Sequence, residues 1–310
     1  MFHLMLLGLA AGMFFSATFI LNRVMSLEGG HWYWSAALRY AYMIVFLGAA
    51  LRACKGGAYF RRVLSEFKRN RLFWVMSGSI GFGGFYSLIC FAADYSPGWV
   101  VATTWQMTII ASLFVLTIFG KSFSRKIWVY SAIVFSGVFL VNISQVERAN
   151  IMSTVLGASP VLLAAFLYPL GNQLVWEAKQ GRKGLPELDT GLLDNAFAKV
   201  FLLSVGSLPF WLLLYPFTSA TLPGQGQIVN VAMVALFSGV IATSLFLSAR
   251  NSADSASKLA AVDATQSSEV IFALAGETLL LQTSLPNTTA ILGMFVACAG
   301  LIAFVRHEHK

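Results

Sequence analysis

The apolar residues of this chain fall into ten runs, each about as long as a membrane-spanning helix. The runs cover residues 2–22, 33–53, 72–93, 98–119, 127–144, 154–176, 195–216, 227–249, 258–282 and 287–305. At a rise of about 1.5 Å per residue, roughly 20 apolar residues cross a hydrocarbon core about 30 Å thick. The pattern therefore predicts an all-α, polytopic membrane protein with about ten transmembrane helices, short connections and no soluble domain.

The first run begins at Phe2 with no basic stretch before it, and it is long enough to span. We therefore expect a first membrane helix there rather than a cleavable signal peptide.

The composition supports a membrane protein and excludes several kinds of site. Only 11% of the residues are charged, whereas soluble domains carry about 25%. The three cysteines form no CxxC pair, which predicts neither a disulfide framework nor a zinc site. Because no GxxxxGK[ST] motif occurs, the chain has no ATP site of its own. We expect no metal and no cofactor.

The positions of the basic residues predict the orientation in the membrane. All but four of the 21 lysines and arginines lie in alternate connections, at the ends of the runs beside those connections, or in the C-terminal tail. Of the four exceptions, Arg23 and Arg148 lie in the other connections, and Arg39 and Lys199 lie within runs. Cytoplasmic loops are enriched in Lys and Arg, so both termini are expected in the cytoplasm. This distribution, despite a net charge of +8, argues against a nucleic-acid partner.

Ten helices divide into two halves of five, residues 1–150 and 151–310. An odd number of spans per half places the halves in opposite orientations, which is the inverted repeat common in transporters. An offset of 160 residues aligns polar positions of the two halves: Arg39 with Lys199, Asp94 with Asp254, and Gln106 with Gln266.

The ninth run contains the largest group of polar residues within a span. Asp263, Gln266 and Glu269 follow one another at intervals of three, so this arc cannot all face lipid. Because an ionisable group at the membrane centre costs at least ~2.5–3.5 kcal/mol, it usually faces a cavity or a partner. Glu269, or Asp263 nearer the inner end, is a candidate proton-binding carboxylate, since burial favours the protonated form. The alternative is an ion pair with Arg39 or Lys199 that stabilises the bundle.

The two basic residues within runs also have two interpretations. Arg39 and Lys199 occupy matching places in the second and seventh runs. They either neutralise an anionic substrate, or form structural pairs or extend to the membrane interface. Since both signs of charge lie in the membrane, the sequence leaves the charge of a substrate open.

Further polar and aromatic residues predict a binding site between the halves. Trp105 and Gln106 in the fourth run would form one wall with Gln266, unless these amides only link helices. In the sixth run, Pro169 marks a kink between Tyr168 and Asn172. It indicates either an ordinary bend or a broken helix that exposes backbone to a substrate.

The counterpart of Asn172 in the first half is Asn22 at the end of the first run, if the first helices of each half are aligned by their ends.

Two short motifs do not indicate catalysis. Asp189-Thr190-Gly191 matches the aspartic-protease triplet, but it occurs once and in a connection without a β-strand context. Gly81-Phe82-Gly83-Gly84 lies inside the third run, where it indicates close helix packing rather than a nucleotide loop.

Several features together resemble the drug/metabolite transporter superfamily. Gly276-Glu277 resembles the Gly-Glu pair that often closes the last-but-one helix of each half, and Gly293 and Gly300 resemble its glycine-rich last helix. Arg39 resembles an arginine often seen in the second helix. With ten spans and very short loops, the whole chain is most similar to the multidrug resistance efflux branch, which is related to the small multidrug resistance transporters.

The chain departs from that resemblance in two places. The small multidrug resistance transporters carry an essential glutamate in the first helix, whereas the first run here has no acid. Gly120-Lys121 stands where the first half would have Gly-Glu. Proton coupling would therefore depend on Glu269 or Asp263.

These observations predict a secondary transporter of the bacterial inner membrane that exports small organic solutes by alternating access. Its partners are a small-molecule substrate, the lipid bilayer and the proton as a coupling ion, and a monomer suffices. One alternative is a facilitative exchanger without proton coupling. A second alternative is a membrane-embedded, lipid-acting enzyme, which would need a nucleophile, a metal cluster or paired acids, and the runs contain none of these. A third is an accessory subunit, which would need a partner-binding domain or long loops, and the loops here are short.

Overall fold

The computed structural model describes residues 2–146 and 150–308, and their regular structure is entirely helical. Within these ranges, nine helical stretches are long and apolar enough to cross a membrane. They are Phe2–Leu27, Trp32–Arg69, Arg71–Ala92, Gly98–Ile118, Arg125–Val146, Ile151–Lys179, Ala196–Phe217, Gln225–Asn251 and Thr288–Arg306. These stretches confirm the predicted polytopic all-α architecture.

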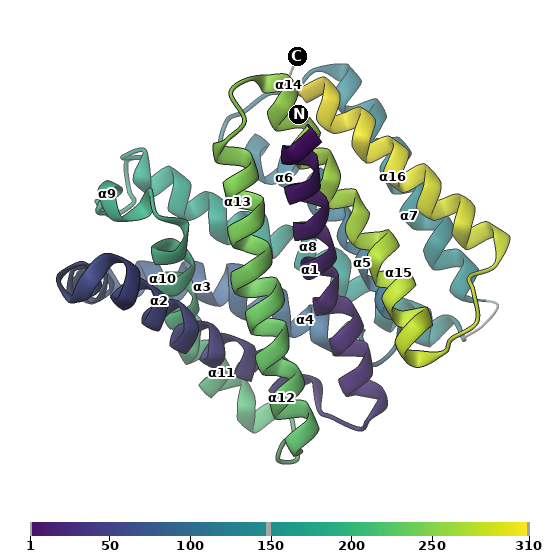
Figure 1. Ribbon diagram of the computed structural model, residues 1–310, viewed down its shortest axis with the longest axis horizontal. Helices are drawn as coiled ribbons and strands as arrows, with labels where there is room; N and C mark the ends of the chain where they lie inside the picture. The colour runs from purple at the N-terminus through teal and green to yellow at the C-terminus, as the bar shows by residue number, and fades with distance from the viewer. Residues whose placement is uncertain (1, 147–149, 309–310) are drawn as a thin grey trace.

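Several spans are built from more than one helical element (Figure 1). The elements of the first half are α1 (Phe2–Leu27), α2 (Trp32–Arg69), α3 (Arg71–Gly78), the π-helix η1 (Ser79–Gly84), α4 (Phe85–Ala92), α5 (Gly98–Trp105), α6 (Met107–Ile118) and α7 (Arg125–Val146).

The second half begins with α8 (Ile151–Lys179), α9 (Thr190–Leu193), α10 (Ala196–Gly206), α11 (Leu208–Leu214), the 3₁₀ turn η2 (Tyr215–Phe217) and α12 (Gln225–Val234). It continues with the π-helix η3 (Ala235–Ala242), α13 (Thr243–Asn251), α14 (Ala256–Ala264), the 3₁₀ turn η4 (Thr265–Ser267), α15 (Ser268–Leu281) and α16 (Thr288–Glu308).

The ninth apolar run is divided into α14, η4 and α15 instead of forming one continuous helix. Ser267 and Ser268 each donate a side-chain hydrogen bond to the carbonyl three residues earlier, at 2.8 and 2.6 Å, and Thr265 does the same. Hydroxyl groups that donate to carbonyls of the preceding turn bend helices. Here each donates to the carbonyl three residues earlier, which is the hydrogen-bond spacing of a 3₁₀ turn. The break contains Gln266 and lies two residues before Glu269, and both are candidate site residues.

The sixth run, by contrast, has no break. α8 stays helical through both Pro160 and Pro169, so the exposed backbone that a broken helix would offer is not found there. The irregular elements of the long spans lie instead at η1, η2, η3 and η4 and at the one-residue interruptions at Gln106 and Ser207.

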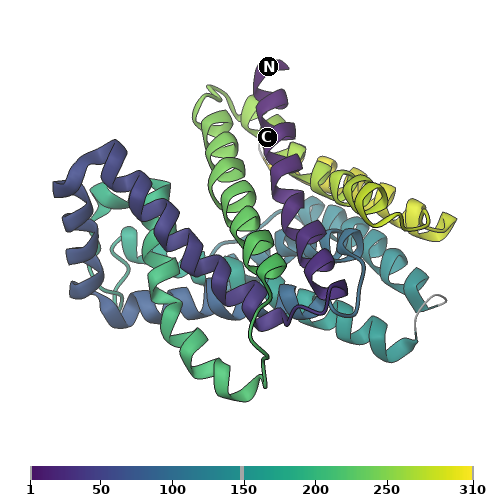
Figure 2. The same ribbon diagram turned by 60° about the horizontal axis from the view of Figure 1, so that its bottom comes forward.

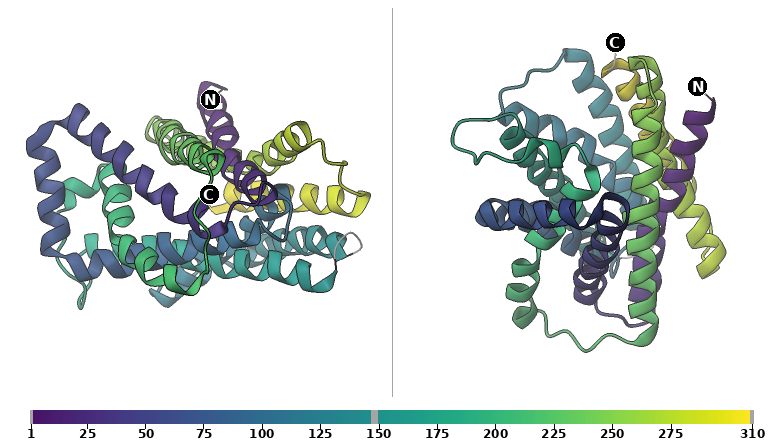
Figure 3. Two further views of the ribbon diagram at one scale, coloured as in Figure 1. Left: turned by 90° about the horizontal axis from the view of Figure 1, so that it is seen from below. Right: turned by 60° about the vertical axis from the view of Figure 1, so that its left-hand side comes forward.

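The helices that open the two stretches 2–146 and 150–308, α1 and α8, each pack mainly against two other spans. α1 packs against α13 and α15, and α8 packs against α4 and α6. The central contacts join α2 to α10, α5 to α15, and α7 to α16. In the left view of Figure 3, α1, α12–α13 and α15 lie on one side of the molecule, and residues 71–146 and α8 lie on the other.

The second helix is longer than its apolar run. The sequence predicts a connection from residue 54 onward, but the structure has a second helical segment there. It follows a kink at Gly56, where φ is 85°, and α2 ends at Arg69. A glycine adopts this left-handed conformation without steric cost. The exposed extension is held by a bidentate ion pair from Arg62 to Asp189, at 2.6 and 2.7 Å, and reaches the far left of Figure 2.

Glycines allow the closest approaches between helices. A side chain at Gly81 would meet the backbone of Gly171, which confirms the packing role predicted for the glycines of the third run. α7 and α16, side by side in Figure 1, approach through Gly137 and Gly293, where each faces the backbone of the other helix. Small residues at such crossings let membrane helices gain van der Waals contact.

Replacing Gly137 with Leu should destabilise the fold, because its side chain would run into the backbone of Ala297 and Gly293. Overpacking of this kind costs about 1–3 kcal/mol of unfolding free energy. The measurement is SDS titration of the purified protein in mild detergent. Ser136→Leu, at the exposed neighbouring position, is the control and should leave stability unchanged. Equal stability of the two variants would contradict the proposed crossing.

Candidate functional site: a cavity between the two halves

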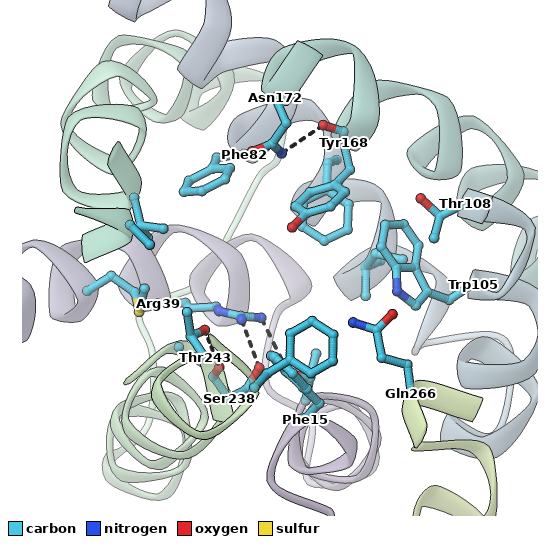
Figure 4. A pocket seen from close by; sticks show the side chains of 18 of the residues that line it. Phe15, Arg39, Phe82, Trp105, Thr108, Tyr168, Asn172, Ser238, Thr243 and Gln266 are labelled. Carbon is cyan, nitrogen blue, oxygen red and sulfur yellow. Dashed lines mark hydrogen bonds between the residues drawn. The ribbon is translucent and has the colours of Figure 1, made fainter. Parts of the chain in front are cut away.

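A cavity of about 420 Å³ lies among helices of both halves. Its walls come from α1, α2, η1, α4, α5 and α6 of the first half and from α8, α10, η3, α13, η4 and α15 of the second. Seven residues selected from the sequence line it: Arg39, Trp105, Tyr168, Asn172, Lys199, Gln266 and Glu269. Residues more than 200 positions apart in the chain thus meet at one site, and Figure 4 shows several of them around its interior.

Aromatic rings form one wall of the cavity. Phe85 lies 4.9 Å from Trp105 and 5.0 Å from Tyr168, measured between ring centroids, and Trp105 lies 5.6 Å from Tyr168. The Gln266 amide lies across from the Trp105 indole (Figure 4). This wall offers a stacking surface with an amide at its edge, and Trp105 and Gln266 both line it.

Arg39 supplies positive charge deep in the cavity. Its guanidinium donates to Ser238 Oγ at 3.1 Å and to Thr18 Oγ1 at 3.5 Å, and it lies 4.1 Å from the ring centroid of Tyr86. Its buried Nε atom has no hydrogen-bond partner. Among the described residues Arg39 forms no ion pair, so only hydroxyls and an aromatic face offset its charge.

Asn22 lies behind the cavity rather than on its wall. Its amide is buried and donates to the Tyr86 hydroxyl at 3.1 Å. The Tyr86 ring in turn contacts the Arg39 guanidinium. Asn22 therefore holds the ring on which Arg39 rests, and it does not face the interior as its pairing with Asn172 suggested.

Gln106 also takes no part in the predicted wall. It is 4% exposed, and its amide donates to the carbonyl of Ala102 at 3.3 Å. Successive residues of a helix point about 100° apart, so when Trp105 faces the cavity, Gln106 turns into the bundle. The predicted pairing of two amides is thus reduced to Gln266.

The two acidic candidates have different surroundings. Asp263 forms an ion pair with Arg250, whose guanidinium lies 2.7 Å from the carboxylate. Glu269 is 7% exposed and lines the cavity. Across residues 2–146 and 150–308, no ion pair joins Glu269 to Arg39 or Lys199. The structural pair considered from the sequence is therefore absent, and Asp263 takes its partner from α13.

The cavity extends toward one side of the bundle. Ala196 and Lys199 at the start of α10, and Arg250 at the end of α13, belong to its lining. These helix ends adjoin the connections rich in Lys and Arg, and we call this side the basic side. The cavity thus reaches from the middle of the bundle to the side that the charge pattern predicts to be cytoplasmic.

Packed aromatic residues occupy the opposite side of the cavity. Tyr40 is stacked between Phe82 and Trp211, at centroid distances of 5.1 and 5.8 Å, and all three rings are buried. The Tyr33 hydroxyl donates to the carbonyl of Trp211 at 2.9 Å. These four residues, called the aromatic plug below, join α2, η1 and α11 beyond the cavity.

Several lining residues had no distinguishing signal in the sequence. Thr18 and Ser238 are hydroxyl residues within apolar runs, where such residues are common and usually bond to their own helix. Phe85 is one of 26 phenylalanines. Their role in the cavity depends on which face of each helix turns inward, which the apolar pattern of a buried span does not specify.

Comparison with known proteins gives consistent matches. Residues 2–310 match the family described as "Putative multidrug resistance efflux transporter". The uncharacterized protein YjlA of Bacillus subtilis (strain 168) is 39% identical over 312 residues, covering 96% of this chain and 92% of that protein.

Two further matches are more distant. An uncharacterized 42.1 kDa protein of Shouchella clausii is 35% identical over 256 residues, covering 78% of this chain and 63% of that protein. A protein of known crystal structure, 14% identical, has a similar fold, with a TM-score of 0.60 and coverage of 99% and 98% of the two chains.

Replacing Tyr86 with Phe should destabilise the protein without removing the ring beneath Arg39. The change deletes the hydroxyl that Asn22 bonds, and an unsatisfied buried polar group costs about 1–3 kcal/mol. Tyr86→Leu should cost more, since the contact between the cation and the ring is also lost. SDS titration measures both, with the exposed Tyr95→Phe as control. An unchanged midpoint for Tyr86→Phe would show that the Asn22 hydrogen bond contributes nothing.

Proposed function

Since this chain belongs to the family of putative multidrug resistance efflux transporters, within the drug/metabolite transporter superfamily, we propose that it exports small organic solutes as a secondary transporter. The chain is a multi-pass membrane protein of a family that transports small solutes.

The cavity between the halves is the observation that carries the proposal. Ligand pockets of about 300–1,000 Å³ are lined mostly by apolar and aromatic side chains with a few polar groups. A cavity of about 420 Å³ with Trp105, Tyr168, Asn172 and Gln266 on its walls fits that description. In transporters with two repeats, the substrate binds near the membrane midplane at the repeat interface.

Alternating access would come from movement of one half against the other. The equivalent contacts made by α1 and α8 support an arrangement as inverted repeats, residues 1–150 and 151–310. The cavity reaching the basic side, with the aromatic plug beyond it, supports an inward-facing state. Opening the other side would require Tyr40 to separate from Trp211.

The proposed location is the bacterial inner membrane, with both termini in the cytoplasm. The asymmetry of Lys and Arg between alternate connections supports this orientation. The cavity is formed from one chain, so a monomer suffices for transport.

Proton coupling, if present, would use Glu269. It is a buried carboxyl group on the cavity wall, and the described residues contain no cation that forms an ion pair with it. Ionisable residues in such positions mark proton relays in many transporters. Asp263 is less suited, because Arg250 already pairs with it. A facilitative exchanger without proton coupling remains the alternative.

Transport is tested with purified protein in liposomes on a solid-supported membrane, screened with cationic drugs, amino acids and anionic metabolites at two pH values. We expect a saturable current for at least one class, and its sign gives the charge of the transported species. Counterflow of a radiolabelled form of each probe detects electroneutral exchange. Neither current nor counterflow with folded protein would contradict the proposed function.

Glu269→Gln should abolish uptake or release driven by a pH gradient, because the amide cannot carry a proton. Counterflow at equal pH should remain within about twofold of the unmodified protein, since a single conservative change leaves the rest of the wall intact. Glu187→Gln, in an exposed connection, is the matched control. Full pH-driven transport by a folded Glu269→Gln protein would reject the role of Glu269 and favour the exchanger.

A further inference from the structure

The balance of charge in the cavity bears on the chemical class of its substrate. Four charged residues line it: Arg39, Lys199, Arg250 and Glu269. Arg250 is neutralised by Asp263, whereas Arg39 and Lys199 form no ion pair among the described residues. Two uncompensated cations therefore face one carboxyl group, and the cavity carries a net positive charge whether or not Glu269 is ionised.

Arg39 has the geometry of a binding group rather than of a structural cation. Its partners are two hydroxyls and the Tyr86 ring, all uncharged. A buried guanidinium is costly unless it is paired, and here its carboxylate partner is missing from the described residues. Figure 4 shows the guanidinium extending from α2 into the cavity, with Tyr168 and Trp105 around the same space. An anionic group of a bound solute would complete its coordination.

Lys199 and Arg39 lie at different depths along the helices that line the cavity. Arg39 is seven residues into α2, about 10 Å from the end opposite the basic side, at a rise of 1.5 Å per residue. Lys199 is three residues into α10, about 5 Å from the basic side. Lys199 therefore lies near the entrance on the basic side, and Arg39 lies nearer the opposite end of the cavity. Cations placed along a low-dielectric path attract anions and accelerate their binding.

Resting on the proposed function, we propose that the substrate is a small organic anion with a planar apolar body. Arg39 binds the anionic group, the wall of Phe85, Trp105 and Tyr168 stacks on the body, and Lys199 attracts the anion from the basic side. A carboxylate or phosphate would suit the guanidinium, which binds both through paired hydrogen bonds. A lipophilic cation, in contrast, would meet two unpaired positive charges.

The experiment compares three probes of matched shape: 2-naphthylacetate, 2-(2-naphthyl)ethanol and 2-(2-naphthyl)ethylamine. Their affinities for the full-length protein in neutral-lipid nanodiscs are measured by titration calorimetry. We expect the acid to bind at least about tenfold more tightly than the amine, with the alcohol between them, since a charge-assisted hydrogen bond supplies such a difference. Trp105→Ala should weaken all three, which assigns the binding to the cavity.

Variants of the cations separate charge from packing. Arg39→Gln should weaken the acid by about tenfold or more and change the alcohol by less than about twofold. Arg39→Lys keeps the charge but loses the planar fork, so it should retain part of the acid preference. If Arg39→Gln fails to fold, Arg39→Lys and Lys199→Gln still decide the question. Arg125→Gln and Lys126→Gln, at exposed positions, are the matched controls.

Lys199→Gln should weaken the acid by about threefold at low ionic strength, and this loss should shrink as salt screens the entrance. Glu269→Gln should preserve or tighten binding of the acid, because it removes the one lining carboxyl group, and should weaken the amine. A cationic substrate bound at Glu269 would also lose affinity in that variant, so the response of the acid is the decisive value.

The outcomes separate this inference from the proposed function. The anion assignment would be overturned if the amine bound more tightly than the acid. It would also be overturned if all three probes bound equally and all lost affinity in Trp105→Ala. Either result would leave the proposed transport function unaffected. An acid preference that persists unchanged in both Arg39→Gln and Lys199→Gln would also overturn the anion assignment. Failure of all three probes to bind folded protein would also overturn this inference, whereas the proposed function is tested separately by the current and counterflow measurements.

Discussion

Every charged side chain inside the bundle must be compensated by other parts of the protein, because hydrocarbon offers no partner. Insertion scales put the cost of a charge at the membrane centre at about 2.5–3.5 kcal/mol or more. Arg250 and Asp263 meet this requirement by pairing with each other across α13 and α14. Arg39 meets it only in part, through two hydroxyls and the Tyr86 ring. The cavity is the place where compensation among the described residues is incomplete, and for this reason we propose it as the binding site.

The irregular helices place the polar groups at that site. The 3₁₀ turn η4 contains Gln266 and closely precedes Glu269, and the π-helix η3 contains Ser238, the hydrogen-bond partner of Arg39. π-helical turns occur often at functional sites, and here they change which residues of a span face inward. Close glycine contacts hold the surrounding helices in register, as at Gly81 and Gly171 between η1 and α8. Tight crossings at the edges thus coexist with an open volume between the halves.

An anionic substrate would alter the energetics of export. An interior at negative potential drives an anion outward, at about 2.3 kcal/mol per charge for each 100 mV. Export of this class would then not require exchange for a proton, and the facilitative alternative would suffice. Glu269 would still influence binding, because its charge state changes the positive potential that the anion meets. The sign of the measured current and the response of Glu269→Gln both report whether export requires exchange for a proton.

The amino-acid sequence alone was enough to predict the membrane architecture. The length of an apolar run predicts a span because the thickness of the bilayer is known, and the positions of Lys and Arg predict the orientation. The sequence also identified Arg39, Lys199 and Glu269, because ionisable residues in apolar runs are rare. It did not show that Gln106 turns into the bundle, that Asp263 pairs with Arg250, or that α8 stays continuous through Pro169. Those outcomes depend on which face of each helix meets which neighbour, and an apolar run has the same composition on its lipid-facing and its buried face. Helix rotation and pairing are therefore set by packing between segments distant in the chain, and the partner of each buried charge emerges only when the helices are assembled.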